Sequence, residues 1–101
     1  MIYVLSTCVV AMGKKEDFEN MFKEVANVNE KHGAKLIGFW WTIGGEGNEA
    51  VWLSSWKNFE AFEKGQDSAW KDREFPRDKI ASSAISYTDK MLKPSPLYPP
   101  K

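Results

Sequence analysis

The stretch from His32 to Trp56, HGAKLIGFWWTIGGEGNEAVWLSSW, decides the fold of this chain. It holds four of the 5 tryptophans and five of the 7 glycines. Three glycines and an asparagine within residues 44–48 can adopt the positive φ angles that a hairpin loop requires. The stretch therefore predicts a β-hairpin whose strands cover Lys35–Ile43 and Glu49–Trp56.

Both strands of this hairpin carry bulky apolar side chains on both faces. In the first strand, simple alternation puts Leu36 and Trp40 on one face and Ile37, Phe39 and Trp41 on the other. In the second strand, Val51 and Leu53 lie on one face, and Trp52 and Trp56 lie on the other. A strand that faces water should instead alternate apolar with polar residues. Because large exposed apolar patches are uncommon on monomers, we expect a second copy of the chain to cover one face, giving a homodimer.

The flanking segments complete a strand, helix, strand, strand, helix, strand order. The predicted elements are a first strand over Ile2–Val10, an amphipathic helix that begins near Glu16 and has Lys31 and His32 in its last turn before Gly33, a helix capped by Asn58 and ended by Gly65, a short turn begun by Asp67, a short helix begun by Pro76, and a last strand with Ile85, Tyr87 and Met91 on one face. This order predicts an α+β fold, a ferredoxin-like βαββαβ sandwich with one antiparallel sheet and its helices on one face. We expect a single domain over residues 1–101 that ends in an extended, proline-rich tail, 93–101.

Composition excludes several classes of function. The 14 basic and 14 acidic residues cancel, so no basic face for nucleic acid is expected. The apolar start, Ile2 to Met12, is too short for a membrane span. With 1 cysteine and 1 histidine, a zinc-type metal site is not expected either. The lone Cys8 cannot form an internal disulfide, which favours a reducing, cytoplasmic location.

Motifs along nearly the whole chain resemble the NIPSNAP family. They are Met1-Ile2-Tyr3 with Leu5 and Thr7, Gly13-Lys14, His32-Gly33, Lys35-Leu36-Ile37-Gly38-Phe39-Trp40, Asn48-Glu49, Asp67 with Trp70, and Leu92-Lys93-Pro94. The resemblance implies a dimeric α/β barrel, in which two ferredoxin-like protomers pack sheet against sheet. The wider superfamily includes haem-degrading and antibiotic-biosynthesis monooxygenases, which use a pocket between sheet and helices.

One departure from the family pattern bears on catalysis. Relatives often carry Val-His-Leu-Trp in the strand after the hairpin loop, where this chain has Val51-Trp52-Leu53-Ser54. If that histidine does chemistry in relatives, this chain has lost it.

The candidate ligand-pocket residues are Gly38, Trp40, Trp52 and His32. The tryptophans can line a pocket for a flat ligand or serve as core and dimer interface, since aromatic residues suit both roles. Gly38 leaves space beside Trp40, or marks a bulge. His32 is either a base or haem ligand, or a helix-end residue that interacts with the terminal carbonyls. A Cys8–His32 dyad is a further, weaker hypothesis, because nothing evident lowers the pKa of Cys8.

Two main functions follow as hypotheses, and a third possibility is a purely structural dimer with no pocket. The first is a dimeric barrel that binds a small apolar molecule or serves as an interaction module, without a cofactor and without assigned catalytic residues. The alternative is a monooxygenase-like or haem-binding enzyme, as in the superfamily.

Overall fold

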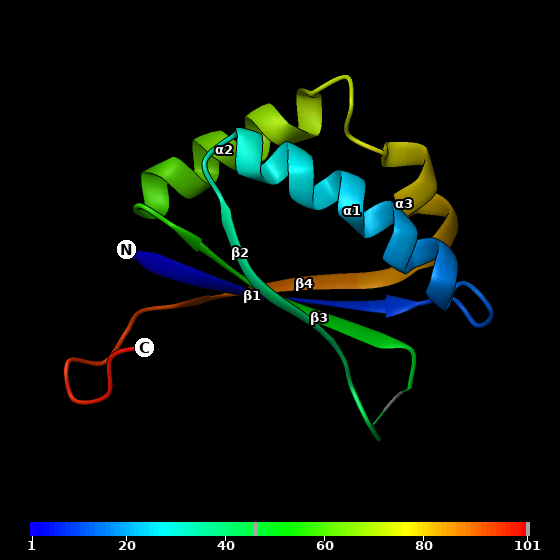
Figure 1. The fold of residues 1–101 in the computed structure, drawn as a ribbon, viewed down its shortest axis with the longest axis horizontal. Helices are drawn as coiled ribbons and strands as arrows, with labels where there is room; N and C mark the ends of the chain where they lie inside the picture. Colours follow the sequence, from blue (N-terminus) through cyan, green and yellow to red (C-terminus); the bar gives the residue numbers. More distant parts are fainter. Residues whose placement is uncertain (46, 101) are drawn as a thin grey trace.

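The computed structural model describes residues 1–45 and 47–100, and it confirms the predicted α+β, ferredoxin-like sandwich. Its elements are β1 (Ile2–Val10), α1 (Lys15–Lys31), β2 (Lys35–Trp41), β3 (Glu49–Trp56), α2 (Phe59–Lys71), α3 (Arg77–Ser83) and β4 (Ala84–Leu92). The strands form one antiparallel sheet in the order β2-β3-β1-β4. The helices all cover one face of this sheet and leave the other face open (Figure 1).

Alternation along β1 places the core between the sheet and the helices. Val4, Cys8 and Val10 point toward the helices and are fully buried. The apolar stripe of α1 meets them, and Phe22 packs 4.9 Å from the Trp52 ring on β3. Burial of these large side chains from strand and helix is the main force holding the two layers together.

The predicted ends of α1 and β3 and the predicted cap of α2 agree with the structure. His32 is the C-cap of α1, and Gly33 follows with a φ of 111°, the left-handed conformation that ends a helix. The side chain of Asn58 accepts a 2.8 Å hydrogen bond from the backbone of Ala61, which caps α2.

The prediction that Gly65 ends the second helix is wrong. The helix continues to Lys71, and Asp67 lies inside it, paired with Lys71 at 3.1 Å, instead of beginning a separate turn. Gly65 is buried against the Trp56 ring, and an added Cβ would lie 2.5 Å from the His32 carbonyl oxygen. Glycine at position 65 therefore serves close packing of α2 on β3 and on the end of α1.

The predicted faces of β2 are also wrong. The register shifts between Leu36 and Gly38, because Leu36 pairs with Ser54 while Gly38 pairs with Leu53. This bulge at Ile37 puts Leu36 on the helix side together with Phe39 and Trp41, which pack against the core. Ile37 and Trp40 remain about half exposed on the open side. Strand β2 also ends at Trp41, two residues before the predicted end.

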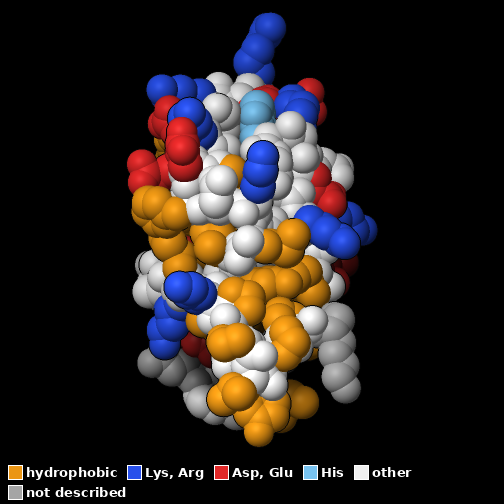
Figure 2. Space-filling view, turned by 90° about the vertical axis from the view of Figure 1, so that its left-hand side faces the viewer, with side chains coloured by type: hydrophobic (Ala, Val, Ile, Leu, Met, Phe, Trp, Pro, Cys, Tyr) orange, Lys and Arg blue, Asp and Glu red, His pale blue; other side chains and the backbone are white. Residues whose placement is uncertain are grey.

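The open face of the sheet carries exposed apolar residues near the C-terminal tail. Over its described residues, 93–100, the tail forms neither helix nor strand, as predicted, but it bends over residues 96–98 instead of remaining extended. Tyr98 and Pro100 border a groove of about 690 Å³ with Tyr3, Ile37 and Leu92. Figure 2 shows hydrophobic side chains gathered over the lower half of this end, beneath the charged helices. Glu46, in the hairpin loop, lies outside the described residues.

Candidate functional site

A cavity of about 180 Å³ lies between the sheet and the helices. Its floor comes from β1, β3 and β4, and its roof from α1, α2 and α3. The residues that line it are Val4, Ser6, Cys8, Phe18, Met21, Phe22, Val25, Ala26, Asn29, Glu30, Ala34, Leu36, Trp52, Ser54, Gln66, Trp70, Phe75, Ile80, Ala84 and Tyr87. Most of these side chains are apolar. Such a cavity matches a small apolar molecule, since a cavity of about 150 Å³ is large enough to bind benzene.

The mouth of the cavity lies beside the edge strand β4. Trp70 and Tyr87 line the cavity, yet 54% and 52% of their surfaces are exposed. The floor residues Val4 and Cys8, by contrast, are 1% exposed. A residue that lines a cavity and also faces solvent marks an opening, so a ligand can enter between α2 and β4.

Two polar groups meet near this mouth, Ser6 in the cavity lining and Asp89 exposed beside it. Ser6 on β1 is buried, and its hydroxyl donates a 2.6 Å hydrogen bond to the Asp89 carboxylate on β4. Ser6 and Asp89 are cross-strand partners, so their side chains share the helix side of the sheet. Tyr87 lies two pairs further along, opposite Cys8, with its ring 5.8 Å from the Trp52 ring. An apolar cavity with a few convergent polar groups is the usual form of a small-molecule site.

The phenol of Tyr87 is held in its protonated form. Tyr87 is half exposed, and the partial desolvation of its phenol is the first cause that raises its pKa above the usual range. The neighbouring charge of Asp89 raises the pKa further. Tyr87 therefore remains able to donate a hydrogen bond at neutral pH.

Cys8 lines the cavity as an apolar group. It is free and buried, and burial raises the pKa of its thiol to about 11 from an ordinary 9.0. Among the described residues, the only hydrogen bond that the thiol makes is a long one, in which Sγ donates to the carbonyl oxygen of Val9 at 3.8 Å. Since the thiolate is the reactive form, Cys8 is unsuited to act as a nucleophile, and the structure does not pair it with His32.

The four predicted pocket residues fall in three separate places. Trp52 lines the cavity. Gly38 and Trp40 lie on β2 outside it, with the Trp40 ring folded over Gly38 so that an added Cβ would lie 2.6 Å from this ring. The space expected beside Gly38 is therefore filled by its own neighbour. Whether any of the four binds a ligand stays a prediction.

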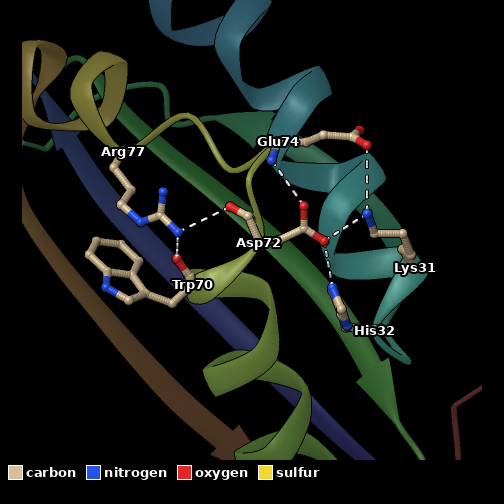
Figure 3. A network of polar contacts seen from close by, with 6 residues as sticks. All are labelled: Lys31, His32, Trp70, Asp72, Glu74 and Arg77. Carbon is tan, nitrogen blue, oxygen red and sulfur yellow. Dashed lines mark hydrogen bonds and ion pairs between the residues drawn. The ribbon is translucent and has the colours of Figure 1, made fainter.

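His32 belongs to a polar network that joins the ends of α1 and α2 (Figure 3). Its Nε2 lies 2.8 Å from Oδ2 of Asp72, the C-cap residue of α2, and Lys31 Nζ lies 2.7 Å from the same oxygen. The backbone N–H of Glu74 donates to the other carboxylate oxygen, and Arg77 donates to the Asp72 and Trp70 carbonyls. This geometry suits a helix-joining role and does not favour a haem ligand at His32, which does not line the cavity.

The electrostatics of this network depend on Asp72, which is only 10% exposed. The Lys31 ammonium, the Glu74 N–H and His32, in that order, hold the pKa of this carboxyl well below its ordinary 3.8. The same contact raises the pKa of Lys31. The network therefore favours the charged forms of both partners in the folded state.

Sequence reasoning missed Ser6 and Asp89, although both leave a signal. Ser6 interrupts the apolar face of a β-branched first strand. Asp89 falls on the same alternation as Ile85, Tyr87 and Met91, where an apolar residue is expected. A polar residue at the apolar position of each of two strands indicates a polar spot on the helix side of the sheet, but only the pairing of β1 with β4 brings the two together.

Comparisons with known proteins agree with this fold. A family model described as NIPSNAP matches residues 3–95. An uncharacterized NIPSNAP domain protein from Burkholderia xenovorans is 16% identical, with a TM-score of 0.85 over 99% of this chain and 100% of that one. A NIPSNAP family protein with unknown function from Agrobacterium tumefaciens is 20% identical, with a TM-score of 0.83 over 96% and 93% of the two chains.

More distant structures share the fold. A putative antibiotic biosynthesis monooxygenase from Nitrosomonas europaea is 11% identical, with a TM-score of 0.69 over 92% of this chain and 97% of that one. The search of curated proteins gave no match. In the described part of the chain, no helix is both long and apolar enough to cross a membrane.

Proposed function

This chain belongs to the NIPSNAP family, and on that basis we propose that it is a homodimeric protein that binds a small apolar molecule in each protomer. The cavity between sheet and helices is the observation that carries this proposal. Its volume of about 180 Å³ suits a ligand of one or two rings. The half-exposed Trp70 and Tyr87 give such a ligand a route of entry.

We propose binding as the function instead of a reaction. The buried thiol of Cys8 is protonated, and the imidazole of His32 is engaged by Asp72 outside the cavity. Neither group is therefore arranged as nucleophile or base toward a ligand in the cavity. The single free, buried cysteine also supports the proposal of a cytoplasmic location.

The homodimer part of the proposal rests on the open face of the sheet. Ile37, Trp40 and Leu92 are between 42% and 51% exposed there. Val51 and Leu53 lie between them on β3 and are only partly buried. A contiguous apolar face of this kind is typical of an interface, and a two-fold dimer would cover it with an identical face.

Binding is tested with phenethyl alcohol in an NMR titration of the isotope-labelled protein. We expect saturable shifts confined to residues around the cavity. The variant Ala26→Leu fills the cavity from α1 and should abolish these shifts, whereas Asn27→Leu, on the exposed side of the same helix, should not. Shifts that persist in Ala26→Leu would contradict binding in the cavity.

Haemin is the competing probe, and a Soret shift lost in His32→Ala would favour the monooxygenase-like alternative instead.

A further inference from the structure

Asp89 is a carboxylate without a cationic partner beside an aromatic cavity. In the described residues, every ion pair of a lysine, an arginine or the histidine is made with another acidic residue. Asp89 instead accepts the Ser6 hydroxyl at 2.6 Å through Oδ1. Asp89 itself is exposed and does not line the cavity, but this hydrogen bond holds its carboxylate beside Ser6, which does line it.

Two cavity-lining aromatic rings lie on the same side of the sheet as this carboxylate. Tyr87 precedes Asp89 on the same face of β4, and the Trp52 ring lies 5.8 Å from the Tyr87 ring. Trp70 also lines the cavity on the side of α2, but the Arg77 guanidinium already lies 5.8 Å from the centre of its ring. The face of an aromatic ring carries negative charge density, which attracts a cation within about 6 Å. The carboxylate and the rings therefore favour the same charge in a ligand.

We infer that the cavity takes an amphiphilic amine, whose apolar ring enters between the sheet and the helices and whose ammonium group binds the Asp89 carboxylate at the mouth. This inference rests on the proposed function and specifies the class of its ligand. Ser6 is a positioning residue, because it touches Asp89 and holds its Oδ1. An anionic ligand is disfavoured because it would meet the Asp89 charge.

The test compares three probes that share a phenyl ring: phenethylamine, phenethyl alcohol and phenylacetate. We expect phenethylamine to bind at least about tenfold more tightly than the alcohol, the size of a hydrogen bond to a charged group, and phenylacetate more weakly than both. The Asp89→Asn variant keeps the side-chain shape and removes the charge, so its affinity for phenethylamine should fall to that for the alcohol. Asp78→Asn removes the same charge from the exposed first turn of α3 and should leave the preference unchanged.

The outcomes separate this inference from the proposed function. Equal affinities for amine and alcohol in the unmodified protein, or a preference retained in Asp89→Asn, would overturn the amine inference while leaving binding in the cavity intact. No binding of any probe would overturn both. If Asp89→Asn retains its affinity for phenethyl alcohol, its cavity is folded. The ranking of the three probes by the unmodified protein tests the preference for an amine without any variant.

Discussion

At the scale of single residues, Gly65 shows how one missing side chain fixes the packing of two elements. Alanine normally stabilises a helix interior over glycine, by about 1 kcal/mol. Here an added Cβ would meet the Trp56 ring and lie 2.5 Å from the His32 carbonyl oxygen, and this backbone atom cannot yield easily. We therefore expect Gly65→Ala to destabilise the protein by about 1–3 kcal/mol in urea unfolding. Ser68→Ala, exposed on the same helix, serves as the control, and an unchanged midpoint for Gly65→Ala would contradict the packing.

Asp72 gives stability a defined pH dependence. Its pKa is lowered in the folded state, so its contribution is complete above the unfolded value of 3.8 and is lost as the pH falls below that value. Asp72→Asn should lower the melting temperature at pH 7, with a gap that narrows as the pH falls below 3.8. Asp67→Asn removes a charge from an exposed pair on α2 and should cost little at any pH. A difference in melting temperature between Asp72→Asn and the unmodified protein that does not change with pH would exclude the charge of the carboxylate as its cause.

At the scale of elements, the bulge at Ile37 decides which side chains of β2 enter the core. Phe39 packs 4.5 Å from the Phe22 ring, whereas Ile37 is 47% exposed. Phe39→Ala should therefore cost roughly 3 kcal/mol of unfolding free energy, and Ile37→Ala less than about 1 kcal/mol. The measurement is made in a Trp40→Glu background, so that covering of the open face does not contribute. Similar costs for the two variants would indicate that both residues share a face, as plain alternation predicts.

At the scale of the whole molecule, the open sheet face gives the prediction of a homodimer. Trp40 on the edge strand β2 is 51% exposed and forms part of the apolar surface that β2 and β3 present. A glutamate there would bring two charges into a two-fold interface, at a large desolvation cost. We expect sedimentation equilibrium to show a dimer at micromolar concentration and a folded monomer for Trp40→Glu. Lys57→Glu, an exposed change just after β3, should remain dimeric, and a monomeric parent protein would contradict the prediction.

The sequence by itself determined the order of elements, the sheet topology and most of the core. Periodicity, caps and turn residues are local signals, and they are sufficient when a segment has one apolar stripe, as α1 has. They fail at Gly65 and Ile37, where a contact with a distant residue outweighs the local rule. From the sequence alone Gly65 is predicted to end a helix, whereas in the structure it lies inside α2, packed against Trp56 and the backbone of His32. Ile37 reads as part of an alternating strand until pairing with β3 inserts a bulge.

The candidate site belongs almost wholly to the tertiary structure. Trp52 could be predicted as a pocket residue from the sequence, because so large an aromatic side chain is a candidate pocket residue on either face of its strand. Ser6 and Asp89 could not, since they are 83 residues apart and meet only because β1 pairs with β4. The sequence predicted a hairpin with apolar side chains on both faces. The pairing of β2 with β3 decided which of its aromatic rings face the helices and which face outward. The physical reason is that alternation fixes the side of a residue only relative to its own strand neighbours, whereas a binding site requires contacts between strands and helices that no local pattern encodes.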